Sequence, residues 1–277
     1  MADMNTKIED VILRYSNRGM NILRNYLEDN YCMNTAKKIA SWDKGNVFLL
    51  TGFYVAGFAE TDGPVGTCVL AKALEKIGYR PVIITDDYCK GFFELENLKV
   101  IYLSNTVDEK DLAELVSIYY PKGMISIERC GKNKFGEYAN MRGISISEYT
   151  APLDKLFERY KGIIPTIGVG DGGNEIGMGN LSDVIANELS LEPCVVGADD
   201  LVIATVSNWG AYGIACALGI VTGNKLLPTF EWVESYIKKT IDIGSVDGVT
   251  HERIVSVDGK GMDIEKEIID SLRLLES

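Results

Sequence analysis

The chain has 277 residues, of which 46% are hydrophobic and 25% are charged, as in an ordinary soluble globular protein. Its net charge is −12, from 40 acidic and 28 basic residues, which argues against binding to nucleic acid or to an anionic membrane surface. The six cysteines form no CxxC pair and the N-terminus lacks the pattern of a signal peptide, so the sequence predicts a cytoplasmic protein with reduced thiols.

The chain divides by pattern into three consecutive parts. Residues 1–45 predict a helical extension with an amphipathic helix from Ile8 to Leu27, and residues 46–224 predict an α/β core. Residues 225–277 predict C-terminal helices and Asp-Gly turns. No Pro-rich or Ser-rich linker separates these parts, so we expect a single domain over residues 1–277.

The core alternates short β-branched runs with helical patterns. The expected strands are Val47–Thr51, Pro81–Thr85, Val100–Leu103, Met124–Glu128, Thr166–Val169 and Leu201–Val206. The expected helices are Val65–Ile77, Glu109–Tyr119, Pro152–Tyr160, Leu181–Leu189 and Asn208–Leu218, followed by Phe230–Thr240 and Met262–Leu275. This alternation predicts a doubly wound, mostly parallel sheet in a Rossmann-like three-layer α/β fold, with extra helices at both ends.

One long uncharged stretch needs an explanation. Leu201 to Asn224 carries no charge and is long enough to cross a bilayer. Polar residues at Ser207 and Asn208 interrupt it, and its first part is rich in β-branched residues. A buried strand, a polar loop and a buried helix therefore account for it better than a membrane span.

Polar residues follow the expected strands at the points where those strands end. These residues are Glu60 to Thr67 after the first strand, Asp86 and Asp87 after the second, Glu128 with Asn140 to Gly143 after the fourth, Asp171 after the fifth, and Ser207 with Asn208 after the sixth. Loops at the carboxyl ends of parallel strands meet at one edge of the sheet. We expect a carboxylate-rich cleft there, with Arg142 as its cation and a divalent metal ion that keeps the carboxylates ionised.

The glycine-rich segment from Pro165 to Gly179 is the strongest candidate for an active-site loop. A strand ends there in glycines that carry Asp171, Asn174 and Glu175. Such a loop leaves backbone N–H groups free and lets a ligand approach the main chain closely. The alternative is a structural turn.

Two common cofactor motifs and one catalytic constellation can be weighed against this hypothesis. The glycines of Gly168-x-Gly170-x-x-Gly173 have the spacing of a dinucleotide-binding fingerprint. In such a site, however, Asp171 would repel the pyrophosphate, and no acidic residue ends a second strand about twenty residues later to bind the ribose. We therefore expect no NAD. No Walker P-loop occurs. His251 is the only histidine, so carboxylates, Lys, Tyr or metal-bound water are the better acid–base candidates.

The tetrapeptide Ser-Val-Asp-Gly occurs twice, at residues 245–248 and 256–259. Two Asp-Gly turns of this kind predict a small hairpin or excursion. We favour a structural role for this segment.

Four motifs carry a resemblance to a known family. They are Glu60-Thr-Asp-Gly-Pro-x-Gly, Asn140-Met-Arg-Gly, Gly170-Asp-Gly-Gly-Asn-Glu-Ile-Gly-Met-Gly and Val206-Ser-Asn-Trp-Gly-Ala. Together, from about Asn46 to Gly259, the chain resembles the D-glutamate cyclase-like C-terminal domain family. The resemblance implies an α/β fold and the conversion of D-glutamate to 5-oxo-D-proline and water. Stand-alone members associated with a divalent metal and phosphatase-like activity supply a second hypothesis.

The sequence yields a set of candidate site residues. The catalytic candidates are Asp171, Glu175 and Asp62. The candidates for binding a small anionic metabolite are Arg142, Asn140, Asn174, Ser207, Asn208 and Thr61. The candidate ligands of Mg²⁺ or Mn²⁺ are Glu60, Asp62, Asp171 and Glu175. These residues fit three functions: a cyclase, a metal-dependent phosphohydrolase and a non-catalytic metabolite-binding module. The sequence is also compatible with a homo-oligomer.

Overall fold

The computed structural model describes residues 7–189 and 191–277 and confirms the expected doubly wound α/β fold. Its main sheet has six strands, and every neighbouring pair is parallel. In spatial order the strands are β5 (Val100–Leu103), β4 (Arg80–Asp86), β1 (Asn46–Thr51), β6 (Met124–Ile127), β7 (Thr166–Gly170) and β8 (Asp200–Ile203). Both faces of such a sheet are covered, which explains why its strands are almost continuously apolar.

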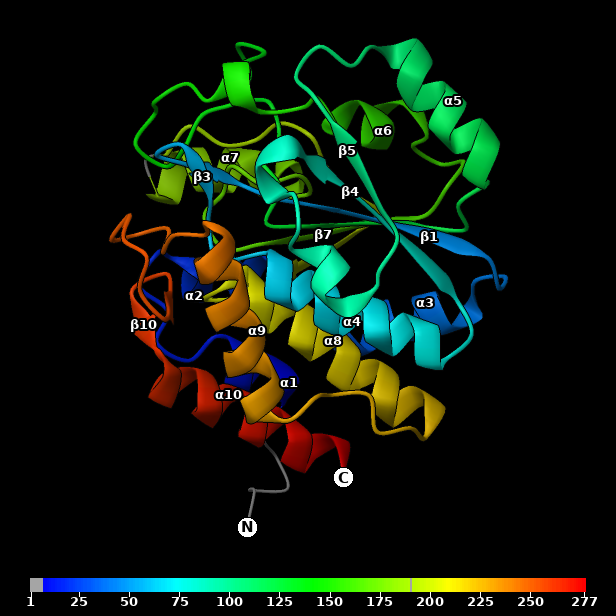
Figure 1. Ribbon diagram of the computed structural model, residues 1–277, viewed down its shortest axis with the longest axis vertical. Helices are drawn as coiled ribbons and strands as arrows, with labels where there is room; N and C mark the ends of the chain where they lie inside the picture. Colours follow the sequence, from blue (N-terminus) through cyan, green and yellow to red (C-terminus); the bar gives the residue numbers. More distant parts are fainter. Residues whose placement is uncertain (1–6, 190) are drawn as a thin grey trace.

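Helices cover both faces of the sheet and form the outer two of three layers (Figure 1). One face carries α3 (Tyr31–Ser41), α4 (Pro64–Lys76) and α8 (Ser207–Thr222). The other face carries α5 (Glu109–Tyr119) and α6 (Asp154–Arg159). Beyond α8 lies a further group formed by α1 (Ile8–Ile12), α9 (Phe230–Ile243) and α10 (Met262–Glu276).

The order of the strands creates a crevice beside the first strand. The chain builds outward from β1 through β4 to β5, then returns to place β6 on the other side of β1. Leu49 of β1 thus pairs with Ile83 of β4 and with Ile125 of β6. The loops that follow β1 and β6 diverge at this switch point, where open α/β sheets bind ligands.

The uncharged stretch forms a buried strand and a buried helix, as expected, but the polar loop expected at Ser207 and Asn208 is wrong, because both residues are buried in the first turn of α8. β8 is followed by α8, and thirteen residues of that helix are buried. Helix α8 is apolar on all sides because the sheet, α3, α4 and α10 surround it. Among the helices of residues 7–189 and 191–277, none combines the length and apolarity that crossing a membrane requires.

Two expected helices are wrong in detail, and one was missed. Ile8–Leu27 is not one helix: it forms α1, α2 (Met20–Leu23) and a 3₁₀ turn, with Gly19 at φ +83° before α2. A left-handed glycine breaks the helical path that the apolar spacing suggested. Leu181–Leu189 forms short 3₁₀, α and π turns in place of a regular helix. Helix α3, which begins directly after Asn30, was not predicted as a separate helix.

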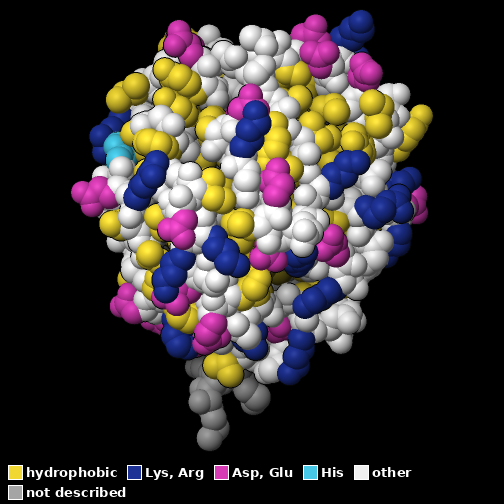
Figure 2. Space-filling view, in the orientation of Figure 1, with side chains coloured by type: hydrophobic (Ala, Val, Ile, Leu, Met, Phe, Trp, Pro, Cys, Tyr) yellow, Lys and Arg dark blue, Asp and Glu magenta, His cyan; other side chains and the backbone are white. Residues whose placement is uncertain are grey.

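The two Asp-Gly turns differ in structure. The second forms a hairpin between β9 (Ser256–Val257) and β10 (Lys260–Gly261). The first is a loop held by Asp247, whose carboxylate accepts hydrogen bonds from several N–H groups. On the face of the molecule in Figure 2, acidic and basic side chains are interspersed and do not gather in one basic area.

Candidate active site

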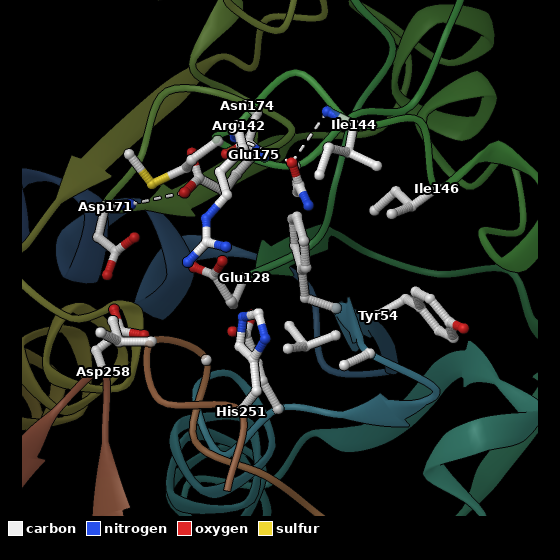
Figure 3. Close-up of a pocket in the computed structure, with 18 of the residues that line it drawn as sticks. Tyr54, Glu128, Arg142, Ile144, Ile146, Asp171, Asn174, Glu175, His251 and Asp258 are labelled. Carbon is white, nitrogen blue, oxygen red and sulfur yellow. Dashed lines mark hydrogen bonds between the residues drawn. The ribbon is translucent and has the colours of Figure 1, made fainter.

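A cavity of about 500 Å³ opens at the switch point of the sheet. Its wall combines the β1 loop, the end of β6, the loop around Asn140, the glycine-rich loop after β7, and the segment from Gly248 to Asp258. Figure 3 shows that the cavity has two unlike sides, with Asp171 and Asp258 on one and Tyr54 and Ile146 on the other. Apolar walls with a few converging polar groups are typical of small-molecule sites.

Six carboxyl groups are buried at the inner side of the cavity or, in the case of Asp62, directly behind it. They are Glu60, Asp62, Glu128, Asp171, Glu175 and Asp258, each at most 7% exposed. Among the described residues, one oxygen each from Asp62, Asp171 and Asp258 lie within 4.8 Å of one another, and so do one oxygen each from Glu128, Asp171 and Glu175. We call these the aspartate triad and the glutamate triad. Asp171 belongs to both, so it is the centre of the cluster.

The backbone around the cavity is held in unusual conformations. Eight non-glycine residues in the described part of the chain have a positive φ, and four of these line the cavity: Ala56, Glu128, His251 and Asp258. Glu128 follows β6 at φ +45°. Non-glycine residues in the left-handed region cost free energy and concentrate at functional sites. This concentration supports a functional role for the cavity.

Glu175 organises the glycine-rich loop from within. Its carboxylate accepts hydrogen bonds from the backbone N–H groups of Gly172 at 2.6 Å and Gly173 at 2.7 Å, and a longer one from Asp171. Gly173 has φ +107°, which a side chain would strain. The free N–H groups predicted for this loop are therefore used by Glu175, and the loop presents the Asp171 side chain to the cavity.

Asp62 joins the loop after β1 to the start of α8. Its two oxygens accept hydrogen bonds from the N–H groups of Ser207 at 2.8 Å and Asn208 at 2.7 Å, and one also accepts from Gly63. A carboxylate at a helix N-terminus is stabilised by those donors and by the helix dipole. Asp62 is thus fixed in position at the back of the aspartate triad.

Three predicted substrate-binding residues form hydrogen bonds to other residues of the protein and do not line the cavity. The Asn208 side-chain oxygen accepts hydrogen bonds from the N–H groups of Gly63 and Gly66. The Ser207 hydroxyl donates to Glu128 at 2.5 Å, and the Thr61 hydroxyl donates to a backbone carbonyl in β9. None of Thr61, Ser207 and Asn208 is among the residues that line the cavity. They position the residues around the cavity, and their role in binding stays a prediction.

Burial and mutual repulsion change the acidity of the cluster. Burial first, and Asp258 second, raise the pKa of Asp62 to about 7 and that of Glu60 well above its ordinary range. Burial, followed by the charge of Asp171, likewise raises the pKa of Glu128. Burial also raises the pKa of Asp171, although Arg18 opposes this shift. Like charges in a low dielectric cannot all ionise without a cation.

Arg18 supplies one cation that the sequence did not indicate. Its Nη1 atom lies 2.9 Å from Asp171 and 2.7 Å from Asp258. The charge of Asp171 is the main reason that the pKa of Arg18 is raised. Arg18 comes from the segment between α1 and α2, which the sequence predicted to be a continuous helix. The guanidinium thus neutralises part of the aspartate triad.

Arg142 lies on the rim of the same cavity. Its side chain is exposed and reaches into the cavity in Figure 3, and it has no ion-pair partner among residues 7–189 and 191–277. Asn140 shapes this loop, because its side-chain oxygen accepts hydrogen bonds from the backbone N–H groups of Arg142 and Ile144. Asn174 lines the cavity, and its side-chain amide donates a hydrogen bond to the backbone carbonyl of Ala139. The structure therefore brings Asn140, Arg142 and Asn174 together with the carboxylates.

Comparison with known proteins places the chain in a family. The pattern of the family described as D-glutamate cyclase-like, C-terminal, matches residues 8–273. The chain belongs to this D-glutamate cyclase-like family. A curated relative is the mitochondrial D-glutamate cyclase of Homo sapiens, which is 33% identical over 190 residues. That alignment covers 58% of this chain and 30% of the human protein, so the chain spans well under two thirds of its relative's length.

In this D-glutamate cyclase-like chain, the carboxylate cluster fits a divalent cation. Glu60 Oε1 and Asp171 Oδ2 are buried and have no hydrogen-bond partner among the described residues. Such oxygens cost free energy unless a ligand satisfies them. Carboxylate oxygens are the ligands that Mg²⁺ and Mn²⁺ prefer. The predicted ligands Glu60, Asp62, Asp171 and Glu175 all belong to the cluster.

The structure adds residues to this site that the sequence did not assign to it. Glu128 was noted at a strand end but given no role, and Asp258 lies in the second Asp-Gly turn, for which a structural role was favoured. That assignment is incomplete, because Gly248, His251 and Asp258 line the cavity. Conversely, Asp86 forms a buried ion pair with Arg129 and does not line the cavity.

Proposed function

We propose that this D-glutamate cyclase-like protein cyclises D-glutamate to 5-oxo-D-proline and water, with a divalent cation bound in the carboxylate cluster. The observation that carries the proposal is the pairing of buried carboxyl groups of raised pKa with the exposed cation Arg142 across one cavity. Family membership and the relative named D-glutamate cyclase support the same reaction. Acid and base groups in one site are what this reaction requires.

The reaction moves two protons from nitrogen to oxygen. The α-ammonium group of the substrate must lose a proton before its nitrogen can attack the γ-carboxyl carbon. As the C–N bond forms, the nitrogen loses a second proton, a C–O bond breaks, and the departing oxygen leaves as water with both protons. One ionised carboxylate can take protons from nitrogen while a protonated neighbour supplies them to oxygen, and no net proton is released.

Glu128 and Asp171 are the strongest candidates for these two roles. Both line the cavity, both belong to the glutamate triad, and burial raises the pKa of each. A carboxyl group whose pKa is raised can hold a proton in one step and release it in the next. Glu175 already accepts three backbone N–H groups, so we assign it to shaping the loop and holding the cation.

Arg142, Asn140 and Asn174 are placed to bind the α-carboxylate of the substrate. A guanidinium binds a carboxylate through two parallel hydrogen bonds, which fixes its orientation as well as its charge. Arg142 is free to do this because no described acidic side chain pairs with it. We assign the contacts that distinguish D-glutamate from its L enantiomer to this rim.

The candidate ligands of the cation are Glu60, Asp62, Asp171, Glu175 and Asp258, which leaves Glu128 to hold the proton that goes to oxygen. A divalent ion would supply positive charge that keeps its carboxylate ligands ionised and makes a bound carboxyl group a better electrophile. The second candidate function is a metal-dependent phosphohydrolase. It is favoured by the two triads that share Asp171, because pairs of neighbouring divalent ions are typical of phosphate-ester hydrolysis.

One experiment separates the two functions. The protein is incubated with D-glutamate, with L-glutamate and with a panel of phosphate esters, each with Mn²⁺ or with EDTA. The cyclase proposal requires 5-oxoproline to form and amine to be lost from the D form alone. Asp171→Asn should abolish this, whereas the surface variant Asp43→Asn should not. Phosphate release without loss of amine would establish the phosphohydrolase instead, and no reaction in any tube would favour a binding module.

A further inference from the structure

The outer side of the cavity is apolar, and D-glutamate does not explain it. This apolar wall consists of Phe53, Tyr54, Val55, Ile144, Ile146 and Tyr149. Figure 3 shows Tyr54, Ile144 and Ile146 across the cavity from Asp171 and Asp258. A cavity of about 500 Å³ suits a ligand considerably larger than a free amino acid. The apolar wall is therefore left uncovered when only glutamate is bound.

The apolar wall presents flat aromatic surface to the solvent. Tyr54 and Tyr149 are stacked, with ring centres 4.0 Å apart and planes 5° from parallel, and Tyr88 meets Tyr54 edge-on. Tyr149 and Ile144 are 47% and 57% exposed. Apolar side chains at a cavity mouth gain free energy when a ligand covers them, and aromatic rings add favourable stacking.

When ionised, the six buried carboxyl groups carry more negative charge than Arg18 and one divalent cation together neutralise, so the inner side of the cavity disfavours a second negative group on the substrate. D-glutamate carries a γ-carboxylate, which would approach the five buried carboxyl groups that line the cavity and Asp62 behind them. Arg18 is already paired with Asp171 and Asp258, so of the two arginines that line the cavity in the described part of the chain, Arg142 on the rim is left for the substrate. A γ-amide removes one negative charge from the substrate while keeping the α-amine and α-carboxylate.

We infer that the preferred substrate is a γ-amide of D-glutamate whose amine part carries an aromatic or branched apolar group. This inference rests on the proposed cyclisation. The α-carboxylate binds Arg142, the γ-carbonyl lies among the carboxyl groups, and the amine part covers the apolar wall. Apolar contact then positions the γ-carbonyl for attack, which lowers the barrier as well as strengthening binding.

The step is balanced without any further reactant. The α-nitrogen bonds to the γ-carbon, and the bond between that carbon and the amide nitrogen breaks. Of the two protons that the α-ammonium group loses, one goes to the departing amine and one is released through a carboxylate to the solvent. The products are 5-oxo-D-proline and, when the amine part is an aniline, a neutral aromatic amine; a more basic alkyl amine keeps the second proton as an ammonium group. A general acid helps here because an amide nitrogen leaves only after it is protonated.

The test compares three substrates that differ only at the γ-carbon. These are γ-D-glutamyl-4-nitroanilide, D-glutamine and D-glutamate, each assayed for 5-oxoproline with the metal-loaded full chain. The anilide also releases a coloured amine. We expect kcat/KM for the anilide to exceed that for D-glutamine, and that for D-glutamate, by about ten-fold or more. Amine and 5-oxoproline should form in equal amounts.

Variants of the apolar wall test where the amine part binds. Tyr54→Ala should lower the ratio of kcat/KM for the anilide to that for D-glutamine by about ten-fold, and Tyr54→Phe should keep the ratio. Tyr149→Ala tests the same stack should Tyr54→Ala fold poorly. Tyr26→Ala is the matched control, since Tyr26 is 51% exposed and does not line the cavity.

Three outcomes would overturn the inference. Turnover of D-glutamate as efficient as that of the anilide would remove the γ-amide preference and leave the proposed function intact. Release of nitroaniline without 5-oxoproline would show simple hydrolysis of the amide. Failure of all three substrates to form 5-oxoproline would overturn the proposed cyclisation itself, and the inference with it.

Discussion

Arg18 and Asp171 form an ion pair across 153 positions of the chain, with an N–O distance of 2.9 Å. Asp171 is 1% exposed, and the same guanidinium nitrogen contacts Asp258. A segment before the sheet therefore neutralises the centre of the carboxylate cluster. Removing one partner of a buried pair leaves the other charge uncompensated, which is far more costly than losing an exposed pair.

The Arg18→Met variant should consequently be destabilised. We expect its free energy of unfolding at neutral pH to fall by about 3–5 kcal/mol, measured by urea denaturation in EDTA. Added Mn²⁺ should restore part of this loss, because it supplies the missing positive charge. Arg14→Met is the matched control, since Arg14 pairs with Glu267 on the surface and should cost about 1 kcal/mol or less. Equal losses in both variants would contradict the role given to Arg18.

The metal-free protein should lose stability as the pH rises. The pKa of Asp62 is about 7 in the folded protein, against an ordinary value of 3.8 for an unfolded chain, so between these values the folded protein holds a proton that the unfolded chain has released. The contribution of this group to stability is therefore complete below about pH 4 and is lost by about pH 7. The raised pKa values of Glu60, Glu128 and Asp171 act in the same direction.

Denaturation across this pH range, in EDTA and in Mn²⁺, measures the effect. Mn²⁺ should flatten the pH dependence, because a bound cation favours the ionised carboxylates. A metal-free protein whose free energy of unfolding rises from pH 4 to pH 7 would contradict the raised pKa values. Asp62→Asn should reduce the slope in EDTA, since it removes one of the titrating groups.

Asp171 should be required for binding the cation. We expect titration calorimetry to show Mn²⁺ binding to the native protein and a loss of about 100-fold or more in affinity for Asp171→Asn, because this residue belongs to both triads. Asp87→Asn is the control: Asp87 is an exposed carboxylate that pairs with Lys90 outside the cavity. Unchanged affinity in Asp171→Asn would remove Asp171 from the ligand set.

Arg142 should act on substrate binding and turnover without affecting stability. We expect Arg142→Ala to lower kcat/KM by about 10- to 100-fold, since a charge-assisted hydrogen-bonded pair is lost. Arg142→Lys should recover only part of the activity, because a point charge does not reproduce the planar guanidinium. Arg159→Ala, which alters an exposed pair with Glu109, should leave kcat/KM unchanged. If Arg142→Ala left kcat/KM as unchanged as Arg159→Ala does, Arg142 would have no role in binding the substrate.

Asn208 should contribute mainly to stability. Asn208→Ala leaves the buried N–H groups of Gly63 and Gly66 without their acceptor, so we expect the free energy of unfolding to fall by about 2–3 kcal/mol. Asn224→Ala, at an exposed position after α8, should change it by about 0.5 kcal/mol or less. A large fall in turnover with unchanged stability in Asn208→Ala would instead support the original prediction that Asn208 binds substrate.

Local patterns of residues were sufficient to predict the sheet and most of its helices. Runs such as Val100–Leu103 and Glu109–Tyr119 match β5 and α5 because strand and helix periodicity depends on residues close together in the chain. The polar strand ends also predicted that Glu60, Asp62, Asp171 and Glu175 would meet, since parallel topology brings those ends to one edge. The family resemblance is confirmed over residues 8–273.

Which side chains face the cavity depends on the tertiary fold and could not be predicted in this way. Asn208 and Ser207 lie at the predicted helix start, yet their polar groups turn to Gly63 and Glu128. Arg18 and Asp258 reach the cluster from opposite ends of the chain. Contacts of this kind depend on how the terminal segments pack against α8 and the sheet edge, and a local pattern of residues carries no information about such distant partners.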